Sequence, residues 1–454
     1  MIHTRSARPP SFPIDLPVLS LIALVVLLGI AGGASRADMI AQVIVRAGCW
    51  AILVVVILFG PRPAGSTLRD MRPVLLLLGV TIALPLFQLV PLPPAWWQAL
   101  PGRAILLVPG EPVPWRPWTM TPGATRNALA SLVVPAAMLV LMLQADGQGA
   151  RRMPAILLAL GGMAVVIGLL QFSGAGFDNP FFNDTPGVVS SIFANRNHFA
   201  LFLAIGCLIA PVWAFMDPTA LRWRAPLAIG LVLLFLLTIL ATGSRAGILL
   251  VAIAFVLILL LIGRSLRRRL RSGPRWLMPA LVLAAIVVIG GFVALSAAAD
   301  RAEGIQRLLA LNPEEDMRTR ARPVVLAMIG LYMPFGSGFG GFDPVFRIHE
   351  PFDLLKITYF NEAHNDFLGI ALDGGIAGIV VLTAGIVWWL VASLRVWRAE
   401  IDERVMLGRL GSGILLLVLV ASLTDYPART PTIMAIIVVA AVWLARGNGG
   451  RFTA

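Results

Sequence analysis

Charged side chains are scarce in this sequence: they make up 13% of the 454 residues, whereas 58% are hydrophobic. The mean hydropathy is +0.88. A soluble domain cannot hide that much apolar surface, so the composition indicates a polytopic membrane protein. The net charge of +13 does not indicate nucleic-acid binding. Arginine in a membrane protein gathers in cytoplasmic loops, and no basic patch in the sequence alternates with aromatic residues.

Cysteine is nearly absent, and both cysteines, Cys49 and Cys207, lie in apolar runs. This excludes a disulfide framework and a thiolate metal site. The sequence also has no Walker loop, no dinucleotide fingerprint, no Cys/His metal spacing and no nucleophile elbow. We therefore expect no cofactor, no metal, and no ATP or nucleotide-sugar chemistry.

Long apolar runs dominate the chain instead. A spanning helix needs about 20 mainly apolar residues, and the sequence offers about twelve such runs. We expect an all-α transmembrane bundle that forms a single integral membrane domain over residues 1–454. The expected spans are Leu16–Gly33, Met39–Gly60, Pro73–Val90, Ala128–Gln144, Pro154–Phe172, His198–Phe215, Pro226–Ala241, Ala246–Ile262, Leu277–Ala298, Asp366–Leu394, Val405–Leu423 and Pro431–Ala445.

The distribution of arginine predicts the orientation of these spans. With the N-terminus inside, every even-numbered connection faces the cytoplasm, and each of them carries at least two arginines. This alternation follows the positive-inside rule. It predicts that both termini are cytoplasmic and that the long, polar loop over residues 300–364 is periplasmic.

Two outer segments have features of their own. Pro91–Asn127 is rich in proline and tryptophan, which favours an interfacial anchor at the lipid headgroups, although a wall on which sugars stack remains an alternative. The loop Asp300–His364 should contain a short helix from Arg320 to Leu331 that ends before Pro334.

Arginines in and near these outer segments are candidates for anion binding. Arg245 lies in a short turn between two apolar runs, and Arg318, Arg320 and Arg322 precede the glycine-rich turn over residues 335–342. A guanidinium can hold two phosphate oxygens at once. The alternatives are a snorkelling anchor for Arg245 and a solvated helix face for the other three.

Histidine is rare, with four residues in the chain. His364 lies where the long loop meets the tenth span, so it is our candidate general base, because imidazole titrates near neutrality. His198, at another outer helix start, is the rival.

Asp373, followed by two glycines within the tenth span, could break the helix, pair with an arginine or carry protons. The glycine pair favours the first of these roles.

Four motifs together resemble the O-antigen ligase and polymerase family of membrane glycosyltransferases. They lie in the region 195–378, in the order found in that family. They are Asn195-Arg196-Asn197-His198-Phe199-Ala200, Gly243-Ser244-Arg245-Ala246-Gly247, the segment from Pro334 to Phe342, and His364-Asn365-Asp366-Phe367-Leu368 through Asp373-Gly374-Gly375 to Gly378. The segment from Pro91 is similar, more loosely, to exopolysaccharide polymerases.

The resemblance implies an inverting, metal-independent glycosyltransferase of the bacterial inner membrane. Such an enzyme moves a glycan from undecaprenyl pyrophosphate to an acceptor hydroxyl on the periplasmic side. Arg245 and His364 match the family's arginine and histidine. Arg320 best matches its second arginine, but Pro323 stands where the family has tryptophan, so Arg318 and Arg322 stay open. The remaining motif residues expected to contact substrate are Asn195, Asn197, His198, Gly338, Gly340 and Asp366.

Three functions remain open at this point. A ligase would transfer the glycan to lipid A–core or another carrier, and a polymerase would join repeat units of O-antigen or exopolysaccharide. A polysaccharide or lipid transporter, or flippase, is the alternative from another class. The sequence disfavours a transporter because it shows no internal repeat and because its polar residues gather towards one face.

Overall fold

The computed structural model describes residues 16–36, 38–174, 179–181, 188–270, 313–355 and 360–449. This part of the chain is almost wholly helical and contains one pair of two-residue strands, β1 and β2. The elements are α1 (Leu16–Ala31), α2 (Ile40–Phe59), α3 (Gly65–Asp70), α4 (Arg72–Gln88), β1 (Pro91–Leu92), α5 (Pro94–Gln98), η1 (Ala104–Leu106), β2 (Arg116–Pro117), α6 (Pro122–Ser131), α7 (Val133–Gln144), α8 (Asp146–Phe172), α9 (Arg196–Met216), α10 (Leu221–Thr242), α11 (Arg245–Leu270), α13 (Pro313–Tyr332), α14 (Phe342–His349), η2 (Phe352–Leu354), α15 (Asp366–Arg398), α16 (Glu403–Ala421), η3 (Pro427–Arg429) and α17 (Pro431–Asn448).

The predicted all-α membrane bundle is confirmed. Among the described residues, nine helical segments are long and apolar enough to span a membrane, and α6 and α7 together form one of them. The shorter apolar helices α1 and α4 coincide with the predicted first and third spans. The predicted ninth span, Leu277–Ala298, lies outside the described residues, as do the first residues of the long loop.

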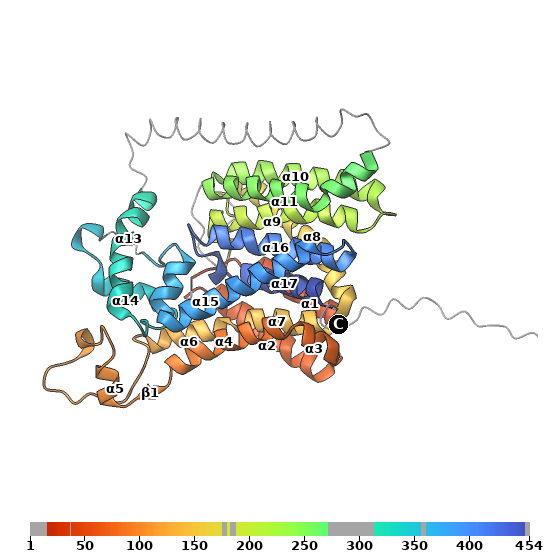
Figure 1. Ribbon diagram of the computed structural model, residues 1–454. Coiled ribbons are helices and arrows are strands. Elements are labelled where there is room, and N and C mark those ends of the chain that lie inside the picture. The colour runs from red at the N-terminus through yellow and green to blue at the C-terminus, as the bar shows by residue number, and fades with distance from the viewer. Residues whose placement is uncertain are drawn as a thin grey trace, which may run out of the picture.

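Helix α9 forms the centre of the bundle. In its apolar stretch 83% of the residues are buried, whereas in that of α15 only 17% are. A helix that is apolar on all sides belongs inside a bundle, and α9 packs against α8, α10, α11 and α16. Because most residues in that stretch of α15 are not buried and α15 runs along the bundle (Figure 1), we infer that α15 faces lipid.

Local sequence signals begin or end several helices at one end of the bundle. Asn195 and Asn365 cap α9 and α15, each accepting a hydrogen bond from a backbone N–H of the first turn. Gly243 ends α10 in a left-handed conformation, with φ of +63°. Hydrogen bonds connect the turns at residues 195, 243, 365 and 422–430. Helices α13 and α14 lie at one end of the bundle (Figure 1) and pack against α15, which begins directly after the turn at residue 365.

Helices α13 and α14 form a small second core over this end of the bundle. The predicted helix Arg320–Leu331 is confirmed, but α13 begins earlier, at Pro313. A proline followed by acidic residues is a typical helix start, which the predicted boundary overlooked. Helix α13 ends at Tyr332, before Pro334, as expected.

The glycine-rich turn docks on a kink in α15. The N–H groups of Ser337 and Gly338 donate to the carbonyls of Leu372 and Asp373, at 2.9 and 3.0 Å. At the kink Gly375 has φ of +57°, and a Cβ there would lie 2.3 Å from the Pro334 carbonyl oxygen. Only glycine permits both this backbone and this approach.

The segment from residue 91 to residue 118 forms a hairpin at the same end (Figure 1). Arg103 is fully buried and donates to the carbonyls of Trp118 and Gly336, which fixes the hairpin against the glycine-rich turn. Trp97 is buried, whereas Trp96 and Trp115 are 68% and 64% exposed. The two exposed rings are available to an interface, so the anchor remains a prediction.

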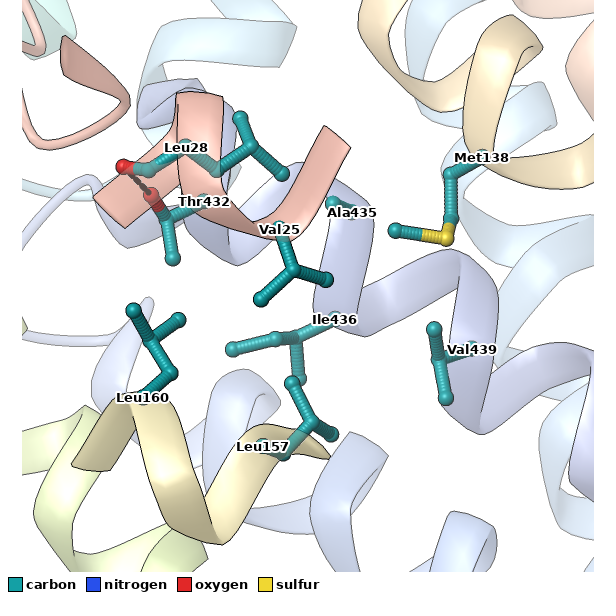
Figure 2. Close-up of a pocket in the computed structure, with 9 residues that line it drawn as sticks. All are labelled: Val25, Leu28, Met138, Leu157, Leu160, Thr432, Ala435, Ile436 and Val439. Atoms are coloured by element: carbon teal, nitrogen blue, oxygen red, sulfur yellow. Dashed lines mark hydrogen bonds between the residues drawn. The ribbon is translucent and has the colours of Figure 1, made fainter. Parts of the chain in front are cut away.

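A small apolar cavity lies between α1, α7, α8 and α17 (Figure 2). Its polar lining group is the Thr432 hydroxyl, which donates to the Leu28 carbonyl at 3.2 Å. The other lining side chains are aliphatic or Met138. The cavity therefore offers no partner to a polar ligand, and we assign it to imperfect packing.

Candidate active site

A histidine–carboxylate pair forms the centre of the candidate site. His364 Nδ1 lies 3.3 Å from Asp425 Oδ1, and the imidazole packs edge-on against the Tyr426 ring, with centroids 5.0 Å apart. His364 comes directly before α15, and Asp425 belongs to the segment between α16 and α17. His364 has φ of +47°, a conformation that non-glycine residues adopt rarely and that is found repeatedly at active sites.

Asp425 also joins the first two motifs to this pair. Its Oδ2 accepts hydrogen bonds from Asn195 Nδ2 at 3.0 Å and from Asn197 Nδ2 at 2.8 Å. The Oδ1 of Asn197 accepts from the Ser244 hydroxyl at 2.8 Å. One continuous network therefore runs from the turn before Arg245 to His364.

The charge states of this pair follow from their surroundings. Burial raises the pKa of Asp425, but the imidazoles of His198 and His364 outweigh burial and hold that pKa well below its usual value. The low pKa of Asp425 favours its ionised form, which only accepts hydrogen bonds, so we assign the proton of the neutral His364 imidazole to Nδ1 and leave Nε2 as an acceptor. Burial lowers the pKa of His364, the Asp425 contact opposes this, and the charge of Arg318 lowers it further.

The rival histidine, His198, shares the same carboxylate from a more enclosed position. Its Nδ1 is 2.9 Å from the Thr430 hydroxyl, and its Nε2 is 3.8 Å from Asp425 Oδ1. The His198 side chain is 1% exposed, against 14% for His364. An acceptor can thus approach His364 more readily than His198.

Two exposed arginines lie at the neighbouring helix starts. Arg245 is the first residue of α11, directly after the Gly243–Ser244 turn. Arg196, the first residue of α9, has its Nη1 3.8 Å from the position of a Cβ on Gly243. Arg245 was predicted from the sequence, but Arg196 was not, because its position beside the same turn depends on how α9 packs against α10.

The three arginines of α13 face different surroundings. Arg318 is half-buried, and its charge acts on His364. Arg320 pairs instead with Asp353, with Nη2 2.7 Å from Oδ2, and Arg322 is exposed. Of the three, Arg318 is the one whose charge lowers the pKa of His364.

A second charged cluster lies beside the pair. Arg429 Nη1 is 2.9 Å from Glu362 Oε1, its Nη2 is 3.3 Å from Asp373 Oδ2, and its Nε is 3.9 Å from Asp366 Oδ1. Burial raises the pKa of Glu362 to about 7, and the two nearby aspartates add to this, although Arg429 opposes it. Asp373 therefore lies just before the kink of α15 and also pairs with Arg429. Helix breaking and pairing with an arginine were two of the three roles that the sequence left open for it.

The glycines expected to contact substrate lie against protein in this structure. A Cβ on Gly338 would lie 1.9 Å from the Thr119 hydroxyl, and one on Gly340 would lie 2.8 Å from the Ala124 carbonyl oxygen. The Gly340 N–H donates to Asp373 Oδ2 at 3.2 Å. We infer that these glycines join the glycine-rich turn to the segment 119–124 and to α15.

Three residues of this site, Asp425, Tyr426 and Arg429, were not predicted from the sequence. All three lie in the few residues between two apolar runs, a place where short polar connections are ordinary. One signal was present in the sequence. An aspartate and an arginine lie at a predicted outer membrane edge, and ionisable side chains near the hydrocarbon are costly and are often functional. Nothing in the spacing linked them to His364.

With this geometry established, comparison with known proteins identifies the region. Residues 229–383 match the family model described as O-antigen ligase. The chain contains an O-antigen ligase domain. The resemblance is thus confirmed over residues 229–383, which hold three of the four motifs, and the protein is a multi-pass membrane protein with a place in polysaccharide biosynthesis. The O-antigen ligase match includes Arg245, Arg318 and His364, whereas Asn197 and Asp425 lie outside it. No curated protein matches the chain.

Proposed function

We propose that this protein transfers a glycan from a polyprenyl-pyrophosphate carrier to an acceptor hydroxyl at the periplasmic face of the bacterial inner membrane. The observation that carries the proposal is the contact of His364 Nδ1 with the Asp425 carboxylate, beside a turn that ends in an arginine. The O-antigen ligase match supports lipid-linked glycans as substrates.

His364 is the general base of this reaction. The acceptor hydroxyl gives its proton to Nε2 while its oxygen attacks the anomeric carbon, and the bond from that carbon to the pyrophosphate oxygen breaks. Attack from the face opposite the leaving group inverts the configuration. Asp425 holds the imidazole in the correct tautomer and stabilises the imidazolium that forms, as in other histidine–carboxylate pairs. A positioned base supplies ~10²–10⁴-fold in rate.

Arginines stabilise the departing pyrophosphate. Arg245 is the first, as the sequence predicted, and Arg196 lies beside the same turn. The sequence favoured Arg320 as the second clamp, but its pairing with Asp353 and the influence of Arg318 on His364 favour Arg318. A fixed guanidinium aimed at the developing charge lowers the barrier in the transition state.

The acceptor decides between ligase and polymerase. In both reactions the donor, the base and the arginines have the same roles, so purified protein should be given lipid-linked donor with one acceptor at a time. Product on lipid A–core identifies a ligase, and product on a second lipid-linked repeat unit identifies a polymerase. Glycan that crosses the vesicle membrane without any transfer to either acceptor would instead identify a transporter.

A further inference from the structure

Arg429 joins the two segments that carry the histidine and its carboxylate. It lies on η3 and faces Glu362, Asp366 and Asp373. Glu362 and Asp366 lie two residues before and two residues after His364, and Asp373 lies about two turns along α15. All three belong to the segment that presents the base.

The first turns of α15 are shaped around this arginine. A Cβ on Gly369 would lie 2.6 Å from Arg429 Nη2, so glycine leaves the space that the guanidinium fills. Asp366 Oδ2 also accepts from the Ser422 hydroxyl at 2.9 Å and from the Ala428 N–H at 3.2 Å. The segment 422–430 is therefore held on α15 at several points.

Asp425 lies within that same segment, four residues before Arg429. Its contact with His364 is 3.3 Å, just beyond the usual range of about 2.7–3.2 Å for an N–H···O hydrogen bond, so a small shift of the segment would break it. We propose that Arg429 is a positioning residue: its fork to Glu362 and Asp373 docks the segment 422–430 on α15 and thereby holds Asp425 against His364. This inference rests on the proposed function.

The groups that face His364 determine what the test should show. They are Asp425 and Tyr426 from the segment 422–430, Arg318 from α13 and His198 from α9. Asp425 raises the pKa of His364, whereas burial, Arg318 and His198 lower it. Loss of the Asp425 contact alone therefore moves the acid limb of the rate profile to lower pH.

Arg429→Lys is the test variant, because lysine keeps the charge but cannot reach two carboxylates as a fork. With full-length protein in lipid nanodiscs, we expect transfer to fall by ~10²-fold, the effect of a misplacement of about 1 Å. Donor binding should be unchanged, and the acid limb of kcat/KM should move to lower pH. Asp425→Asn should move the limb in the same direction.

Arg409→Lys is the matched control. Arg409 is another buried arginine, but it donates to the carbonyls of Val396, Trp397 and Ala399 at the opposite end of the bundle. It should lower thermal stability without moving the acid limb. Gly369→Ala, which displaces Arg429 without replacing it, is the second test variant and should reproduce the shift.

The outcomes separate this inference from the proposed function. If His364→Ala transfers glycan normally, the proposed function fails and the positioning role fails with it. If His364→Ala is inactive and Asp425→Asn moves the acid limb, while folded Arg429→Lys and Gly369→Ala keep the wild-type rate and limb, the positioning role alone is overturned. If Arg429→Lys does not fold, the Gly369→Ala profile decides.

Discussion

Replacing Asp425 by asparagine tests the histidine–carboxylate pair with almost no change of shape. Asn195 and Asn197 both donate to the Oδ2 position, so the oxygen of the new amide must lie there. Its NH₂ group then lies at the Oδ1 position, 3.3 Å from His364 Nδ1. Because that NH₂ group donates, His364 Nδ1 must accept, and the imidazole proton moves to Nε2.

The wrong tautomer removes the base, so transfer should fall by the ~10²–10⁴-fold that a positioned base supplies. The Tyr426 N–H, which donates to Oδ1 at 3.0 Å, loses its acceptor. A buried donor left unpaired costs ~1–3 kcal/mol of stability, which thermal unfolding in detergent would detect. Single-turnover transfer and donor binding should be measured on the same folded sample. Wild-type transfer with an unchanged pH profile would refute the pairing.

Three further predictions concern the elements around this pair. Arg318→Gln should slow transfer more than Arg320→Gln and move the acid limb of kcat/KM to higher pH, because it removes a positive charge that lowers the pKa of the base. Equal losses without a shift would contradict the assignment. Gly375→Ala should lower the free energy of unfolding by ~1–3 kcal/mol through backbone strain, whereas Gly385→Ala, with open space around it, should not; denaturant titration compares them. A nitroxide at Trp96 should meet lipid-soluble relaxing agents before water-soluble ones, and the reverse would favour a sugar-stacking wall.

The fold was accessible from the sequence because the bilayer imposes a simple rule. Every backbone polar group in lipid must be paired within its own helix, so apolar runs of sufficient length and their flanking arginines predict the spans. The kink at Gly375 was suggested by the glycine pair after Asp373. Its cause, the docking of the glycine-rich turn through the Pro334 carbonyl, depends on tertiary contacts between distant segments.

The site could be predicted from the sequence only in part. His364 and Arg245 could be proposed from residue chemistry, position and a family resemblance. Asp425 and Arg429 could not, because their roles arise only when the segment after α16 folds back on the start of α15. Substrate contact by Gly338 and Gly340 remains a prediction. Their close contacts with Thr119 and Ala124 favour a role in packing between segments over a role in substrate binding.

Transfer by purified His364→Ala protein beside His198→Ala protein tests the central claim most directly. Both histidines lie near Asp425, so the two variants remove side chains beside the same carboxylate. They differ in solvent exposure, because the His364 side chain is the more exposed of the two. We predict that His364→Ala binds lipid-linked donor with wild-type affinity and fails to transfer it, whereas His198→Ala still transfers glycan. Wild-type transfer by His364→Ala, or loss of donor binding as its only defect, would contradict the account.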